Sequence, residues 1–277
     1  MAKFVLKANG EKERFSAEKI YRSARRVGAS NSLAKAITKE IEREAYSGIK
    51  TSEIFRKVRR SLEKRIPRTA LRFNLKEGIR RLGPTGFPFE KYIGEIFSKN
   101  GFKVKLNQHI SGYCCGGYEI DFLAEKDNLI YVGECKYRNL FKGKVHSEVA
   151  LANYARFLDI KKGGFLQKTG KKVKSLLVTN RKFTSRAVEY SNCVGVSLLG
   201  WNYPVDRGLE YLIETKKLYP ITILPSLDRS LAQLFASKKI MLVEDILKYS
   251  PEGLVKEVRI SEAKLKKLRR EAETLLE

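Results

Sequence analysis

Hydrophobic residues in the first eighty positions follow two different spacings. On each side of an Asn9-Gly10 pair, apolar and charged residues alternate over a few positions, which predicts a β-hairpin. Beyond the hairpin the apolar residues recur at every third or fourth position, which is typical of amphipathic helices. Ser16 and Thr51 are suited to cap two of these helices, and Gly28 is suited to end the first. Four helices are therefore expected, at residues 16–27, 32–46, 51–66 and 68–82.

Residues 84–222 alternate between helix-like and strand-like patterns. Three helices are expected here, at residues 87–99, 147–158 and 185–192. Five strands are expected between and around them, at residues 102–110, 118–124, 129–137, 175–179 and 195–199. Strands that alternate with helices favour a mixed sheet with helices on both of its faces.

Residues 223–277 carry the pattern of four short amphipathic helices, expected at 231–235, 242–247, 252–255 and 261–276. The passage from Ile260 and Ser261 into the last helix resembles the end of a tandem helix-hairpin-helix unit. Such units grip the DNA backbone without reading its sequence. A plain packing or dimerisation element is an equally good interpretation. The patterns together predict an α/β protein of three domains, at residues 1–83, 84–222 and 223–277.

The charge balance points to a polyanionic partner. The 277 residues include 56 Lys and Arg against 31 Asp and Glu, a formal net charge of +25. Such an excess favours nucleic acid, because the cations neutralise phosphates and release counterions. A thermophile's charged surface is the alternative, but it usually keeps the two signs closer to balance. The chain shows no signal-peptide pattern and no apolar run of membrane-spanning length, so we expect a cytoplasmic protein without membrane contact.

The four cysteines do not suggest a metal site. Cys114, Cys115, Cys135 and Cys193 lack the paired spacing of a zinc ribbon or a disulfide framework. We interpret the vicinal pair at 114 and 115 as buried packing thiols.

Two carboxylates and a lysine are the strongest candidates for chemistry. An Asp127-Asn128 turn between the second and third expected strands sets the register of their pairing. A symmetric hairpin places Asp121 directly opposite Glu134, and Glu119 opposite Lys136. Facing carboxylates on otherwise apolar strands favour a bound cation, and their hard oxygens suit Mg²⁺ or Mn²⁺.

The expected roles follow from that pairing. Asp121 and Glu134 hold the metal, which polarises a scissile phosphate and lowers the pKa of the attacking water. Lys136 orients the water or stabilises charge in the transition state. Glu90, early in the preceding helix, is the expected fourth member, as a third metal ligand or through water. Glu119 competes with it for that role.

The arrangement resembles the PD-(D/E)xK nuclease superfamily. An early helical Glu, then an Asp, then Glu-x-Lys on the next strand are its hallmarks, and residues 87–199 are similar to Mrr-type restriction endonucleases and archaeal Holliday-junction resolvases. The resemblance implies a restriction-endonuclease-like domain with Mg²⁺-dependent endodeoxyribonuclease activity. A purely structural salt bridge from Lys136 to Glu134 or Glu119 is the alternative, although it leaves Asp121 unexplained.

The N-terminal segment resembles a different family. Residues 5–10, 13–15, 19–20 and 48–52 are similar to the ATP-cone, the regulatory nucleotide-binding cap of ribonucleotide reductases. The resemblance implies binding of ATP or dATP by Val5, Lys7, Lys19, Ile20 and Thr51. Two lysines and a helix N-terminus are suited to phosphates. A basic helical DNA-binding module without nucleotide is the alternative.

The expected protein is thus an endonuclease that hydrolyses DNA phosphodiesters, with a nucleotide-binding domain that regulates cleavage. A homodimer would place two active sites on two strands. A resolvase of branched DNA and a non-catalytic, nucleotide-sensing DNA-binding regulator are the rival functions.

Overall fold

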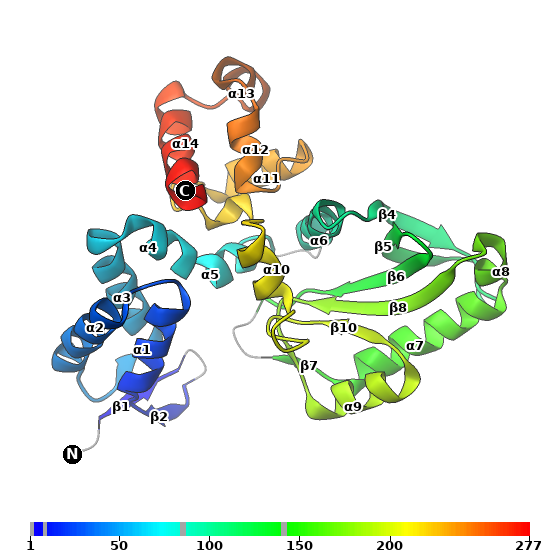
Figure 1. The fold of residues 1–277 in the computed structure, drawn as a ribbon, viewed down its shortest axis with the longest axis horizontal. Helices are drawn as coiled ribbons and strands as arrows, with labels where there is room; N and C mark the ends of the chain where they lie inside the picture. Colours follow the sequence, from blue (N-terminus) through cyan, green and yellow to red (C-terminus); the bar gives the residue numbers. More distant parts are fainter. Residues whose placement is uncertain (1–2, 8–9, 84–86, 140–142) are drawn as a thin grey trace. The chain divides into compact units, whose positions relative to one another are not determined.

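The computed structural model describes residues 3–7, 10–83, 87–139 and 143–277 (Figure 1). The chain forms two compact units. Unit 1 comprises Met1–Gly78, Ile221–Leu231 and Ile246–Glu277, and unit 2 comprises Ile79–Pro220 and Ala232–Asp245. The division into domains at residues 83 and 222 remains a prediction, since the C-terminal helices contribute to both units.

Unit 1 begins with a small three-stranded sheet. Strand β1 (Phe4–Leu6) pairs antiparallel with β2 (Lys12–Arg14), which confirms the expected hairpin strands, and Asn9 of its turn lies outside the described residues. Strand β3 (Ile49–Lys50) pairs parallel with β1 and was not expected. Two residues are too few to show an alternating pattern, so only the long-range pairing reveals this strand.

Three helices follow the expected pattern in unit 1: α1 (Ala17–Arg26), α2 (Asn31–Glu44) and α3 (Thr51–Arg65). The Ser16 hydroxyl caps α1 by accepting from the amide of Lys19, as predicted. Thr51 does not cap α3. Thr51 is the first helical residue, and the cap position belongs to Lys50, whose ammonium cannot accept a hydrogen bond from the helix amides.

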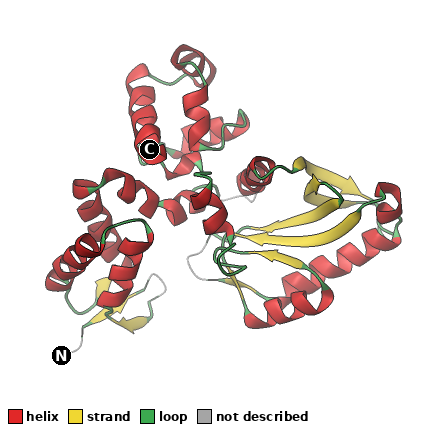
Figure 2. Cartoon of the chain, in the orientation of Figure 1, coloured by secondary structure: helices red, strands yellow, loops and turns green. Residues whose placement is uncertain are grey.

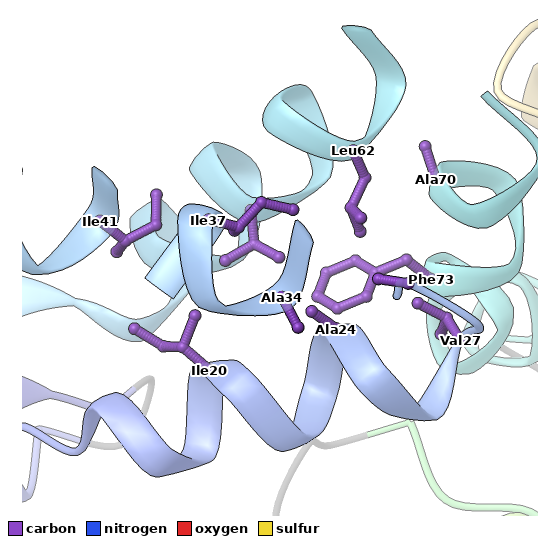
Figure 3. Packing of buried hydrophobic residues seen from close by; sticks show 11 residues of the cluster. Ile20, Ala24, Val27, Ala34, Ile37, Ile41, Leu62, Ala70 and Phe73 are labelled. Carbon is purple, nitrogen blue, oxygen red and sulfur yellow. The ribbon is translucent and has the colours of Figure 1, made fainter. Parts of the chain in front are cut away.

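The fourth expected helix is broken in two. Helix α4 (Pro67–Phe73) ends at Asn74, whose amide donates to the carbonyls of Arg72 and Leu71, and α5 (Leu75–Arg80) follows. Phe73 projects into the core cluster that α1, α2 and α3 form (Figure 3) and stacks on Phe55 with ring centroids 4.6 Å apart. Burial of that ring fixes α4 in place, so local helix propensity does not decide where the helix ends.

Unit 2 is built on a mixed five-stranded sheet with the order β10-β8-β6-β5-β4, drawn in yellow in Figure 2. Its strands match the predicted positions: β4 (Lys103–Ile110), β5 (Tyr118–Lys126), β6 (Leu129–Lys136), β8 (Lys172–Thr179) and β10 (Ser197–Leu199). The first three form an antiparallel meander, whereas β6, β8 and β10 are parallel.

Helices cover both faces of this sheet, as expected. Helix α6 (Phe87–Lys99) packs on β4 and β5, while α7 (Ser147–Lys162) and α9 (Ser185–Val194) connect the parallel strands on the other side (Figure 1). Towards α6, the ring of Phe122 lies over Gly133, where a β-carbon would come within 2.3 Å of it. The ring also contacts Phe97 of α6, at a centroid distance of 5.3 Å. A glycine before Glu134 is therefore a packing requirement.

Smaller elements complete unit 2. They are β7 (Lys144–Val145), which pairs with β9 (Lys182–Phe183), and two short helices, α8 (Phe165–Thr169) and α10 (Leu209–Thr215).

The C-terminal pattern is confirmed as four short helices. They are α11 (Arg229–Ser237), α12 (Val243–Lys248), α13 (Pro251–Val258) and α14 (Glu262–Leu276), and a 3₁₀ turn η1 (Ile221–Ile223) precedes them. Ser261 caps α14, accepting from the amide of Lys264. Over the described residues, no helix combines the length and apolarity that a membrane crossing requires. The molecule is an α/β protein, and its detailed domain identities remain predictions.

Candidate functional site

The carboxylate of Asp121 lies where the β5–β6 ladder ends. The pairing runs from Lys126↔Leu129 to Phe122↔Gly133, so the predicted register is confirmed and the next facing pair is Asp121 and Glu134. At this point a side-chain hydrogen bond takes the place of backbone pairing. Oδ2 of Asp121 accepts from the amide of Cys135 at 2.6 Å. On the other side of β5, the β4 register skips Asn107, which has a positive φ of 50°. The two strands that flank β5, β4 and β6, thus both deviate from regular pairing beside Asp121.

Glu134 is bound by a residue that the sequence analysis missed. Arg156 of α7 donates from Nη1 to Oε2 of Glu134 at 2.7 Å, and the two side chains are 29% and 19% exposed. The Glu134–Lys136 salt bridge, the predicted alternative, is not found among the described residues. Arg156 lies on the same helical face as Asn153 and Ile160, which are buried. The sequence did contain a signal for this contact. Arg156 is a basic residue in a row of buried α7 positions, and a cation there requires an acidic partner.

Glu90 of α6 belongs to the same cluster of carboxylates. Burial, then the charges of Asp121, Glu134 and Glu119 in that order, raise the pKa of Glu90 to about 7. Burial and Glu134 likewise raise the pKa of Asp121 to about 6, against the lowering effects of the Cys135 amide and Arg156. The exposed Glu119 is the smallest contributor in both cases. The structure thus brings Glu90, Asp121 and Glu134 together.

Lys136 ends β6, two residues beyond Glu134. The strand is fixed there because the Lys136 carbonyl accepts from the hydroxyl of Thr179 at 2.7 Å. The side chain is half-buried, and within the described part of the chain its ammonium has no ion-pair or hydrogen-bond partner. The predicted Glu119–Lys136 pair is accordingly absent among these residues.

The donor set fits a hard divalent cation. Asp121 and Glu134 each commit one oxygen, to the Cys135 amide and to Arg156, and the remaining oxygen of each has no partner among the described residues. The described residues contain no group of three His, Cys, Asp or Glu side chains placed to hold a metal by themselves. Mg²⁺ is commonly held by one or two carboxylates and completes its shell with water and substrate phosphate. Glu90 as a direct third ligand remains a prediction.

The raised pKa of Glu90 makes a testable prediction about stability. Its folded pKa of about 7 lies above the ordinary value, so at pH 8 without metal the fold must ionise a half-buried acid. Stability should rise as the pH falls from 8 towards 5, because the folded protein takes up this proton first. Glu90→Gln removes the penalty, and we expect it to raise the pH 8 melting temperature by about 2–4 °C, or about 1 kcal/mol after solvent screening.

Differential scanning fluorimetry in EDTA at pH 5 and pH 8 checks this expectation. Glu119→Gln, at the exposed rim of the same cluster, is the matched control and should change the pH 8 temperature much less than Glu90→Gln does, because its charge is the smallest contributor. Equal melting temperatures for Glu90→Gln and the parent at pH 8 would show that the ionised Glu90 carboxylate does not destabilise the fold.

The prediction that Cys114 and Cys115 are buried packing thiols is wrong. Cys114, Cys115 and Cys193 are exposed, and Cys135 is buried. The loop that carries the vicinal pair lies on the surface, because the Asp159 carboxylate accepts from the backbone amides of Cys114 and Cys115 at 2.9 and 3.2 Å. Backbone hydrogen bonds, not packing of thiols, fix this loop.

A second candidate site lies in unit 1. Four of the five residues predicted to bind nucleotide, Val5, Lys19, Ile20 and Thr51, line a pocket of about 200 Å³ that we call the N-terminal pocket. Its other walls include apolar side chains, among them Phe15, Ile54 and Phe73. The fifth, Lys7, is held beside it by Glu13 at 2.6 Å, and Glu13 also pairs with Lys19.

Comparison with known proteins places the chain in a family. A model of the AF1548-like C-terminal region matches residues 219–276. An uncharacterized protein of Archaeoglobus fulgidus is 34% identical over 186 residues, which is 66% of this chain and 99% of that protein. A crystal structure of a protein of unknown function, AF1548, matches with a TM-score of 0.60 and 32% identity, over 69% of this chain and 98% of that one. The chain therefore belongs to the AF1548-like family.

Proposed function

We propose that this protein is a metal-dependent endonuclease that hydrolyses phosphodiester bonds of DNA. One observation carries the proposal. Asp121 and Glu134 face one another where two strands part, each with an uncommitted oxygen, and their charges raise the pKa of Glu90 from α6. Buried like charges are costly and are characteristic of functional sites rather than of structural ones. The net charge of +25 supports a polyanionic substrate.

The residues of the chain have distinct roles in this proposal. The free oxygens of Asp121 and Glu134 would hold Mg²⁺ or Mn²⁺, which supplies Lewis acidity at the phosphate and an acidified water. The Cys135 amide fixes the orientation of the Asp121 carboxylate, and Arg156 fixes that of Glu134. Lys136, with its ammonium uncommitted, orients the attacking water or stabilises charge on the phosphate. Glu90, whose pKa is about 7 in the metal-free protein, would act beside them as a further metal ligand or through water.

A DNA cleavage panel tests the proposal. Supercoiled plasmid, linear duplex and a four-way junction are incubated with the full chain in Mg²⁺, Mn²⁺ or EDTA, with and without ATP. Metal-dependent nicking or linearisation supports the endonuclease. Cleavage confined to the junction would favour the resolvase. Binding of DNA without cleavage of any substrate would favour the non-catalytic regulator.

Nucleotide binding by the N-terminal pocket is a second proposed function, supported by the four predicted residues that line it. Glu13 opposes it, because this carboxylate neutralises both lysines that would meet phosphates. ATP must displace Glu13 to bind. We therefore propose that nucleotide affinity is set by this competition, and that the bound nucleotide regulates cleavage.

Glu13→Gln is expected to tighten ATP binding about ten-fold, because it frees two ammonium groups that are each worth up to about 1 kcal/mol in such exposed pairs. Isothermal titration calorimetry with ATP and dATP measures the change. Glu18→Gln, which breaks the exposed Glu18–Arg22 pair on α1, is the control and should not alter affinity. Weaker binding by Glu13→Gln would contradict the competition.

A further inference from the structure

A large pocket in unit 1 lies outside both sites described above. Its volume is about 640 Å³, and it is lined by α3, α4, α14 and the segment around Ser226. One part of its lining belongs to residues 219–276, which match the AF1548-like family, and the rest comes from the N-terminal helices. The volume is within the usual range for small-molecule sites, about 300–1,000 Å³. We call it the basic pocket.

Most of the acidic groups of the basic pocket are already committed. Asp228 accepts from the Leu231 amide and the Lys264 ammonium, and Glu271 accepts from the amide and hydroxyl of Ser226. These contacts hold the segment that precedes α11 against α14. The contact with Asp228 neutralises Lys264, whereas Glu271 is held by neutral donors and keeps its negative charge.

Three cations on the lining remain uncommitted. The side chains of Arg59 in α3 and of Lys267 and Arg270 in α14 have no ion-pair or hydrogen-bond partner among the described residues, and Nε of Arg59 is buried without one. Glu63 is the only lining carboxylate in the described chain without a partner. The unpaired charges therefore leave a positive excess in a concave space, which attracts an anion.

Asn74 adds a buried polar group. Its side chain lines the pocket and is only 7% exposed, yet its amide makes no hydrogen bond within the described chain. The amide atoms of Asn74 are not among the buried unpartnered atoms of the described chain, so they are open to the pocket, where they can hydrogen-bond a ligand. This residue also separates α4 from α5.

We propose that the basic pocket binds a small organic phosphate of nucleotide size, with Arg59, Lys267 and Arg270 on the phosphates and Asn74 on a polar group of the ligand. Guanidinium and ammonium groups are the usual phosphate partners in proteins. Apolar walls from Ala70, Leu71 and Leu227 suit a ring. Bare DNA backbone offers no such ring to a pocket, which favours a small ligand over a duplex.

Calorimetric titration of the full chain with ATP, tripolyphosphate, adenosine and a short DNA duplex tests the proposal. The variant is Arg59→Gln with Lys267→Gln, and its control is Arg60→Gln with Lys266→Gln, one position along the same helices and outside the pocket. We expect the variant to bind ATP at one site about ten-fold or more weakly than the parent protein does. In the control, the affinity for ATP should fall by less than about two-fold. Asn74→Asp, which keeps the side-chain shape but adds a negative charge, should also weaken binding.

Several results would overturn the proposal. Equal weakening in the variant and control pairs would indicate general electrostatic attraction. The absence of ATP and tripolyphosphate binding would exclude an organic phosphate. A loss confined to the DNA duplex would make the pocket part of a DNA surface. Because the N-terminal pocket does not share these residues, Lys19→Gln should leave the site in the basic pocket intact.

Discussion

Asp121→Asn is expected to lower the rate of DNA cleavage by about 1,000-fold or more, on the order of 4 kcal/mol of transition-state stabilisation. The substitution removes the negative charge of one proposed metal ligand and leaves its shape unchanged. The amide oxygen of asparagine still accepts from the Cys135 amide, so the parted end of β5 and β6 should keep its structure. Initial rates on supercoiled plasmid in Mg²⁺ measure the effect.

The stability of the Asp121→Asn variant shows whether a lower cleavage rate reflects lost catalysis or unfolding. The pKa of Asp121 is raised to about 6, so at pH 8 without metal its ionised form opposes folding, and Asp121→Asn should be at least as stable as the parent. Stabilisation by Mg²⁺ should disappear in this variant. Asp127→Asn, the same change at the turn of the same hairpin, is the control, because asparagine tolerates its φ of 52°. An Asp121→Asn protein that cleaves at the parental rate would exclude the proposed metal site.

The carboxylate pair could be predicted because its geometry is local. Asp121 and Glu134 belong to one hairpin, and the Asp127-Asn128 turn determines the register of both strands. Strand alternation then suffices to place two side chains opposite each other. The expected bounds of α6 agree with the structure for the same reason, since its pattern is regular and Gly101 follows with a positive φ.

Features that depend on distant partners could not be predicted. Strand β3 exists only because β1 lies beside it, and Asn74 interrupts a helical pattern because α4 is fixed by the burial of Phe73. Arg156 follows Glu134 by 22 residues, and only the crossover from β6 to β8 brings α7 against it. Periodicity gives the face of a helix, but it does not identify which side chain that face meets.

Arg156→Met is expected to destabilise unit 2 by about 2–3 kcal/mol in EDTA. Removal of one partner leaves the Glu134 carboxylate, 19% exposed, without its cation. Breaking a fully buried pair costs about 3–5 kcal/mol, and partial access of water to this pair lowers the expected figure. Methionine retains most of the apolar volume of the arginine stem, so the loss reports mainly the charge.

Two comparisons determine whether charge is the cause. Glu134→Gln added to Arg156→Met should recover more than half of the lost stability, because the remaining group is neutral and can still form hydrogen bonds. Millimolar Mg²⁺ should also restore Arg156→Met more than it stabilises the parent protein, since the metal would take the place of the guanidinium beside Glu134. Urea unfolding at pH 8 measures both effects. If neither the added Glu134→Gln substitution nor Mg²⁺ rescues the variant, Arg156 contributes packing alone, and neither the guanidinium nor a metal stabilises the charge of Glu134.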